Sequence, residues 1–403
     1  MVKITIGVAL LLLIALVGYR QTFTRLRLPS GARLVYLTGT EFIAVGFALG
    51  GELIGLLDED TIRRLTPLFS LGLGATGLIF GIQLDLRVLR RFPARFPLIA
   101  ATQAIVTGIA VFVPFFFILG RLFELESTER WTAAAVLAAT AVCTAQTSLA
   151  LVDREFRLRG AGLIRLLRYV SSLDALVGVT ILGLAFAWRH QSALFGFEAV
   201  IGLQWFFLSV CIGSAMGFLL RILTMVRCTE EELLIFVLGT VLLSSGISLY
   251  FELSPLFVNV LMGIVVANSP GSSERIFTLL ARLEKPVYVV FLLLAGAVWQ
   301  PGVAWGLLLA GVYWLLRISG KVAGGFAAAR FDSGEEPSSP GLGFGLVAQG
   351  GMAVALVMNY YQLRPGSVTD VVVTIVLVGV IASELVAPTF AVRLLRRVGE
   401  IER

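Results

Sequence analysis

Thirteen apolar segments follow one another along this chain, and most are long enough to cross a bilayer. A transmembrane helix needs about 20 apolar residues to span about 30 Å of hydrocarbon. The segments are 4–19, 34–50, 65–84, 97–120, 131–152, 166–188, 200–220, 233–250, 254–267, 277–299, 303–328, 341–362 and 369–392. Only 14% of the residues are charged, against about 25% in soluble globular domains. The pattern therefore predicts an all-α polytopic membrane protein.

The basic residues predict how these segments are oriented. Lys and Arg accumulate in the short cytoplasmic loops of membrane proteins. With the N-terminus outside, the cytoplasmic connections hold 23 of the 32 Lys and Arg residues and the outer connections hold 7. We therefore predict about thirteen transmembrane helices, with the N-terminus out and the C-terminus in. Because the basic residues are spread over separate short loops, the net charge of +6 does not indicate a nucleic-acid partner.

The first segment has an alternative interpretation as a cleaved signal peptide. Lys3 followed by an apolar run fits the outline of such a peptide. Cleavage would place the four arginines of the next loop outside, against the charge bias, and no clear small-residue cleavage site follows. We therefore treat this segment as a transmembrane span.

The thirteen spans divide into two groups of six around a linker. We expect a first repeat over 1–188, a linker helix region over 189–232 and a second repeat over 233–403, all within one transmembrane transporter unit. The ends of the third and tenth spans, 80–86 and 294–300, hold corresponding places in the two repeats. With six spans per repeat and one between them, the second repeat is inverted, which is a recurrent plan of secondary transporters.

Two spans carry breaks in corresponding places. The fifth contains the polar run 140–148, with Gln146 within it, and the twelfth contains Gln349, Gly350 and Gly351. Each glycine costs about 1 kcal/mol in a helix interior, and backbone groups freed in a bilayer must be satisfied by protein or by cavity water. Ordinary helix packing by small residues is the alternative. The matched positions favour two interrupted helices that cross near the midplane.

Asp174 lies in a run that is otherwise apolar. Counted from Arg165 at about 1.5 Å per residue, it lies about 13 Å into its helix, near the membrane midplane. A charge there costs at least about 2.5–3.5 kcal/mol, so such a residue usually lines a water-filled path or meets a partner. Burial favours the neutral acid, and a neighbouring cation favours the carboxylate. If the two effects balance, a proton and a metal ion can compete for Asp174; a buried aspartate satisfied by Ser171, Ser172 or Lys321 is the alternative.

Arg317 and Lys321 lie four residues apart in the eleventh span, and hence on one helix face. Two cations inside a membrane need counter-charge, and Asp174 is the obvious source. Lys321 can form a structural salt bridge or have a functional role, and the sequence does not decide between these two interpretations. They are compatible, because a carboxylate released from a lysine can take up a cation.

The other ionisable residues are less informative. Glu41 lies midway along the second span, as a second acid in the path or facing another helix. Glu384 lies near the end of the last span, where snorkelling explains it. The single histidine, His190, is interfacial, and the three cysteines show no metal or disulfide spacing. We expect no catalytic residue, no enzyme activity and no cofactor.

The order of these motifs resembles the monovalent cation:proton antiporter superfamily, nearest to its Kef-like and sodium/proton exchanger branches. The likeness covers nearly the whole chain. Six stretches carry it: the second span with its Gly-rich run Gly46 to Gly51 (the family's second helix), 80–86 (the glycine–x–x–leucine–aspartate–leucine helix end), Thr147-Ser148 (the first broken helix), 171–174 (the ion-binding acidic pair), Gly320-Lys321 (the helix lysine) and 347–351 (the Gln-Gly-Gly run).

The resemblance implies a core domain and a dimerisation domain, with exchange of Na⁺ or K⁺ for H⁺ by alternating access. It implies that Asp174 binds the proton or the metal ion, with oxygen ligands from Thr147, Ser148 and Ser171. Lys321 and Arg317 would be its charge partners, and Gln146 and the 349–351 backbone would lie at the helix breaks. We expect a homodimer in the plasma (inner) membrane of a prokaryote. Because the sequence ends soon after the last span, only the transmembrane domain of Kef-like proteins is expected.

Two departures from the family pattern leave other functions open. Leu173 stands where many members have Asp or Asn, and Met352 stands where Kef-like members have Glu. A single carboxylate favours one-for-one exchange over electrogenic exchange. One alternative is an organic-anion or solute symporter in which Arg317 and Lys321 bind the substrate, since intramembrane bases outnumber acids there. The other is a degenerate membrane sensor or assembly subunit that transports nothing.

Overall fold

The computed structural model describes residues 41–51, 54–146, 162–194, 200–225, 229–270, 273–331 and 341–400, with the single positions 7, 9, 13 and 14. These residues form helices and no named strand. In chain order the helices are α3 Glu41–Leu49, α4 Glu59–Arg64, α5 Thr66–Ile82, α6 Leu86–Leu89, α7 Arg95–Leu122, α8 Ser127–Val142, α10 Gly162–Ala187, α11 Ile201–Met225, α12 Glu230–Tyr250, α13 Pro255–Asn268, α14 Ser273–Val298, α15 Gly306–Ala328, η2 Ala329–Phe331, η3 Leu342–Leu346, α16 Gly351–Leu363 and α17 Ser367–Val398.

Every apolar segment predicted from residue 34 onward contains one of these helices. Six of the described helices are long and apolar enough to cross a membrane, namely α7, α10, α11, α12, α15 (with η2) and α17, and α5 and α13 are shorter apolar helices. The predicted all-α membrane class is therefore confirmed. Most of the segment 4–19 and residues 34–40 lie outside the described part of the chain. The number of spans and their orientation stay predictions.

Capping residues explain where two helices begin. At α12, the Thr229 hydroxyl accepts a hydrogen bond from the Glu232 N–H, and the Glu232 carboxylate accepts one from the Thr229 N–H at 2.8 Å. At α6, outside the membrane-spanning segments, the Asp85 carboxylate caps the helix. Arg87, 3.2 Å away, holds the pKa of Asp85 below its usual value.

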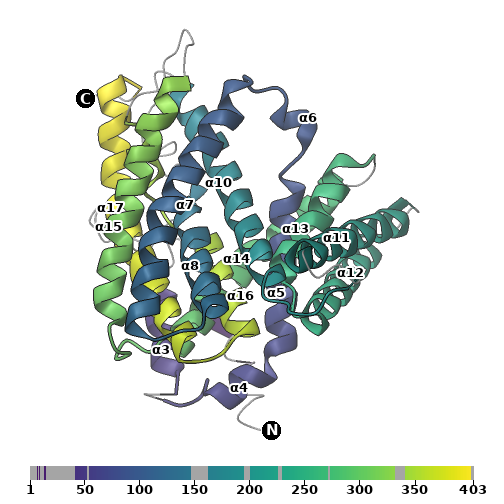
Figure 1. The fold of residues 1–403 in the computed structure, drawn as a ribbon. Coiled ribbons are helices and arrows are strands. Elements are labelled where there is room, and N and C mark those ends of the chain that lie inside the picture. The colour runs from purple at the N-terminus through teal and green to yellow at the C-terminus, as the bar shows by residue number, and fades with distance from the viewer. Residues whose placement is uncertain are drawn as a thin grey trace.

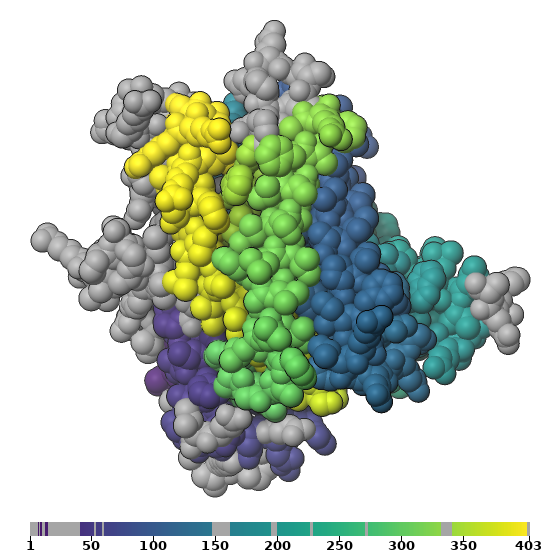
Figure 2. Space-filling view, turned by 60° about the vertical axis from the view of Figure 1, so that its left-hand side comes forward, coloured from purple at the N-terminus to yellow at the C-terminus, as the bar shows by residue number. Residues whose placement is uncertain are grey.

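The helices pack into two groups (Figure 1). In the first, α15 packs on α7 and α17, α8 packs on α7 and α10, and α16 packs on α8 and α17. In the second, α13 packs on α5, α11 and α12. Helix α14 contacts α3, α5 and α16 and so touches both groups. Figure 2 shows α17, α15 and α7 side by side on one face of the molecule.

Two glycines one turn apart bring α15 against α7. A Cβ atom added to Gly320 would lie 3.0 Å from Ala110 Cβ, and one added to Gly324 would lie 3.0 Å from the Gln103 carbonyl oxygen. Small residues at this spacing let helices approach closely inside membranes. The close approach places Lys321, which lies between the two glycines, within reach of α7 and α8.

Both predicted helix breaks are present, and they meet. Helix α8 ends at Val142 and residues 143–145 are not helical, while residues 347–350 are not helical between η3 and α16. The Ala145 N–H donates to the Ala348 carbonyl oxygen at 3.1 Å, so the two non-helical segments touch. The predicted pair of crossed, interrupted helices is confirmed here, although residues 147–161, beyond the first break, lie outside the described residues.

Candidate ion-binding site

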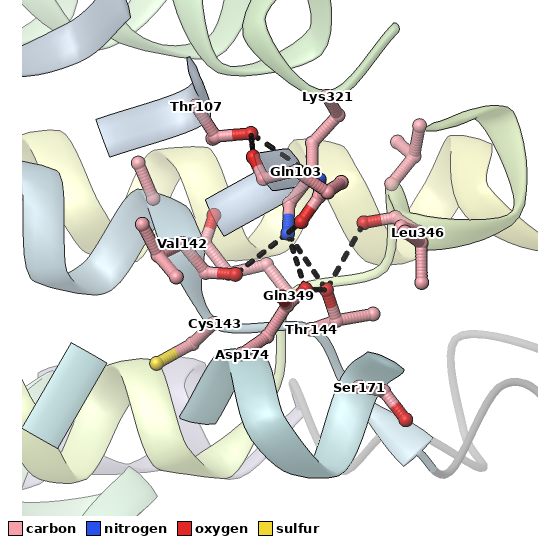
Figure 3. Close-up of polar contacts among 12 residues, drawn as sticks. Gln103, Thr107, Val142, Cys143, Thr144, Ser171, Asp174, Lys321, Leu346 and Gln349 are labelled. Atoms are coloured by element: carbon pink, nitrogen blue, oxygen red, sulfur yellow. Dashed lines mark hydrogen bonds and ion pairs between the residues drawn. The ribbon is translucent and has the colours of Figure 1, made fainter. Parts of the chain in front are cut away.

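Asp174 is fully buried on α10, beside the point where the two helix breaks meet (Figure 3). Its Oδ2 atom accepts hydrogen bonds from the Lys321 ammonium and the Thr144 hydroxyl, each at 2.8 Å. Within the described part of the chain, its Oδ1 atom is buried and accepts no hydrogen bond. One carboxylate oxygen is therefore held by protein groups, and the other is left without a hydrogen-bond donor from the described residues.

Lys321 on α15 is the salt-bridge partner that the sequence predicts for Asp174. Besides Asp174, its Nζ atom donates to the Val142 carbonyl oxygen at 2.6 Å and to the Thr144 hydroxyl at 2.9 Å, and Gln103 Oε1 lies farther away at 3.5 Å. An ammonium has three N–H donors, so the three short contacts use them all. Val142 ends α8, and the negative end of a helix dipole favours a cation there. Lys321 thus ties α15 to the end of α8 and to α10.

Thr144 is the site residue that the sequence did not single out. It lies in the non-helical segment after α8, where its hydroxyl donates to Asp174 and accepts from Lys321. The Leu346 carbonyl oxygen, from the other interrupted helix, lies 3.4 Å from the same hydroxyl. Thr147 and Ser148, which the family resemblance indicates instead, lie outside the described residues. Membership of the polar run 140–148 is the one sequence signal that could have pointed to Thr144.

Arg317 holds the two helix breaks together. Like Lys321 it is fully buried on α15, so both cations lie on the inner face of this helix, as their spacing predicts. A guanidinium has five N–H donors, and all five are used. The acceptors are the carbonyl oxygens of Ala141, Cys143, Val347 and Ala348 and the hydroxyl of Ser383, at 2.5–3.3 Å. Arg317 donates no hydrogen bond to Asp174 among the described residues and acts on it through its charge.

Gln349 joins the second break to the first. Its side-chain amide donates to the Thr140 carbonyl oxygen at 3.0 Å and to the Tyr313 hydroxyl at 2.8 Å. The next residue must be small, because a Cβ atom on Gly350 would lie 2.8 Å from Ala145 Cβ. These contacts explain why the predicted Gln-Gly-Gly run lies at the crossing rather than inside a helix.

A cavity of about 350 Å³ leads to this site. Its walls come from α5, α10, α14 and both breaks and include Thr144, Gln146, Ser171, Tyr288, Gly351 and Met352. Asp174 is fully buried and does not line the cavity, which ends beside it at Thr144 and Ser171. The cavity therefore gives access to within one side chain of the buried ion pair.

The remaining predicted residues lie around the site rather than in it. Ser171 is buried and donates to the Arg168 carbonyl oxygen at 2.9 Å, and the Gln146 amide donates to the Ser172 hydroxyl at 2.8 Å. Glu41 begins the described part of α3. Its two carboxylate oxygens are buried and accept no hydrogen bond from the described residues, and none of the described contacts joins it to Asp174.

Glu384 does not reach the membrane surface as its sequence position predicts. Its position near the end of an apolar segment suggested a side chain that snorkels to the membrane surface. The structure shows that α17 continues to Val398, so that Glu384 lies well inside the helix. It is only 4% exposed, and its Oε2 atom accepts no hydrogen bond from the described residues. The snorkelling interpretation is wrong because α17 continues beyond residue 392, where the predicted apolar segment ends, so that Glu384 is not near the end of the helix.

Comparison with known proteins identifies a solved structure with a similar fold. No family model and no curated protein matches the sequence. The structure is similar to that of the sodium proton antiporter MjNhaP1 from Methanocaldococcus jannaschii at pH 8, with a TM-score of 0.67 and 14% identity over 99% of this chain and 100% of the other. The chain has the fold of that antiporter. The resemblance that the order of motifs indicates is thus confirmed at the level of the antiporter fold.

Proposed function

We propose that this chain is a secondary antiporter that exchanges Na⁺ or K⁺ for H⁺ at Asp174. The observation that carries the proposal is the fully buried Asp174–Lys321 pair at the crossing of two interrupted helices, within an antiporter fold. Removing two charges from water costs about as much as their attraction returns, so a buried ion pair is a poor stabilising device. A pair in this position is better explained by a change of partner during transport.

Lys321 and a cation are alternative partners of one carboxylate. In the conformation described here, Lys321 holds Asp174 Oδ2. A cation that enters through the cavity would displace the ammonium and bind the oxygens of Asp174 and Thr144, because hard cations prefer oxygen ligands. A proton instead neutralises Asp174 and also ends its need for a counter-charge. Proton and cation therefore exclude each other at Asp174, and competition of this kind couples their opposite movements.

Alternating access requires the two helix groups to move relative to each other. Asp174, Lys321 and both helix breaks belong to the group that contains α7, α8, α10 and α15–α17. The cavity lies where this group meets α5 and α14. We propose that the first group carries the site past the second, that the protein works as a homodimer in the plasma (inner) membrane, and that exchange at Asp174 is one for one.

The anion-symporter alternative loses its main support. It needs Arg317 and Lys321 to bind the substrate, but their donors are already used on backbone carbonyls, side-chain hydroxyls and Asp174. Glu384 also adds a second buried acid. Two acids thus face two bases in this part of the core, which removes the excess of positive charge that favoured an anion.

The test is the dissipation of a pH gradient in proteoliposomes on addition of Na⁺, K⁺ or Li⁺. Wild type is compared with Asp174→Asn and with the control Asp60→Asn, which changes an exposed aspartate on α4. The proposal expects cation-dependent dissipation that Asp174→Asn abolishes and Asp60→Asn keeps. Full activity in Asp174→Asn would move the site elsewhere. A folded wild type that is silent with all three ions would favour the anion symporter or a non-transporting sensor.

A further inference from the structure

Glu384 is a second buried acid that the Asp174 site does not use. It lies against the second helix break, since its Oε1 atom is 3.5 Å from the place that a Cβ atom on Gly350 would take. It is 4% exposed, and its Oε2 atom has no hydrogen-bond donor among the described residues. An ionised carboxylate is very costly in such surroundings unless it is paired, whereas the neutral acid is tolerated.

The titratable groups that act on Glu384 come from two neighbouring helices. Arg317 on α15 interacts with it electrostatically but uses all its donors on other acceptors. Tyr288 on α14 interacts electrostatically with Glu384 and with Glu41, which lies on α3. Arg317 thus supplies a positive charge but no hydrogen bond, and the Oε2 atom of Glu384 has no donor among the described residues.

Tyr288 is the residue that we consider as a link between Glu384 and the cavity, because Glu384 lies against Gly350 and Tyr288 lies against the neighbouring Gly351. Tyr288 lines the cavity, and a Cβ atom on Gly351 would lie 2.6 Å from its ring, so it packs tightly against the start of α16. A phenol can accept one proton while donating another. A phenol that bridges the cavity and Glu384 would therefore pass a proton between them and return to its starting state.

We propose that Glu384 is a second proton-binding site, loaded and unloaded from the cavity through Tyr288. In loading, the Tyr288 oxygen accepts a proton from the cavity while its own hydroxyl proton bonds to a Glu384 oxygen, and unloading reverses both transfers. Glu384 becomes neutral and no other group changes charge. The inference deepens the proposed function, because a proton bound here during transport would add to the one exchanged at Asp174.

Infrared difference spectroscopy of the full-length protein between acid and alkaline pH tests the inference without any transported cation. The carbonyl stretch of a protonated carboxylic acid reports each acid that titrates. We expect one such band to be absent in Glu384→Gln and present in both Asp174→Asn and Glu41→Gln. Glu384→Asp, which keeps a carboxyl group, should shift this band and guards against a folding defect in Glu384→Gln. A Glu384→Gln spectrum identical to wild type, or loss of the band only in Glu41→Gln, overturns the assignment.

The route through Tyr288 is tested by following the same band after a pH jump. We expect Tyr288→Phe to slow its response several-fold, while Tyr250→Phe, a change at a tyrosine that is 82% exposed, leaves the response unchanged. An unchanged response in Tyr288→Phe contradicts the route. Because no cation is needed, a failure of this inference can be told apart from a failure of antiport at Asp174.

Discussion

Lys321 Nζ lies 2.8 Å from Asp174 Oδ2, and neither side chain is exposed to solvent. Each charge is therefore compensated inside the protein or not at all. Removing one partner of a buried ion pair costs about 3–5 kcal/mol, because the other charge is left without compensation. Protonation of Asp174 relieves that cost, so the pair links the stability of the fold to the proton that the site is proposed to carry.

Replacing Lys321 with Met should make stability depend on pH. Above the pH at which Asp174 releases its proton, the variant buries an uncompensated carboxylate and should lose about 3–5 kcal/mol. Below that pH Asp174 is neutral, so the loss should shrink as the pH falls. Thermal unfolding of wild type and variant over a pH series measures the effect, and the double variant with Asp174→Asn should not show it. An equal loss at every pH would contradict this explanation.

Replacing Arg317 with Lys should loosen the crossing of the breaks although it keeps the charge. A lysine has three donors in place of five and no planar fork, so at least two buried acceptors lose their partner. Each such loss costs about 1–3 kcal/mol. The midpoint of thermal unfolding should therefore fall clearly, while Arg330→Lys, at an exposed arginine beyond α15, leaves it unchanged. Equal midpoints for the two variants would show that Arg317 does not hold the breaks together.

Thr144 should matter through its hydroxyl. Thr144→Val keeps the shape of the side chain but removes the oxygen that contacts both Asp174 and Lys321, whereas Thr144→Ser keeps that oxygen. We expect cation-dependent dissipation of a pH gradient to be lost or strongly reduced in the valine variant and largely retained in the serine variant. A valine variant as active as wild type would exclude the Thr144 hydroxyl from the cation site.

Gly343 should tolerate no side chain. A Cβ atom there would lie 2.1 Å from the Lys321 carbonyl oxygen, and a backbone atom cannot rotate away as a side chain can. Gly343→Ala should push η3 from α15, cost about 1–3 kcal/mol and reduce exchange by displacing Lys321. The matched control is Gly311→Ala on α15, where nothing lies within 4 Å; it should be neutral or stabilising by up to about 1 kcal/mol. Equal stability of the two variants would contradict the packing argument.

The positions of the helices could be predicted because a membrane imposes one requirement on every spanning segment. An apolar run long enough to cross must be helical, and described helices occupy each predicted segment from residue 34 onward. The Asp174–Lys321 pair was predictable for the same reason, since a charge inside an apolar run needs a partner. Hydropathy does not reveal where a helix continues past its apolar run, so the burial of Glu384 in α17 was missed.

The identity of the third site residue could not be predicted from the sequence. Helical periodicity tells which side chains share a face, but it fails where the chain leaves the helix. Thr144 lies in such a non-helical segment, and no local rule distinguishes its hydroxyl from the others in the run 140–148. The contacts of Gln103 and Thr144 with Lys321 join residues more than 170 positions apart in the chain. Only the packing of α7, α8 and α15 brings them together.

The most direct test of the account is proton release on cation binding by the purified protein in weakly buffered detergent solution. If H⁺ and a cation compete for Asp174, adding Na⁺ or K⁺ to wild type near the pH at which Asp174 titrates should acidify the solution. The Asp174→Asn variant should bind neither ion there and release nothing. Cation binding without proton release in wild type, or equal release in the variant, would contradict exchange at Asp174.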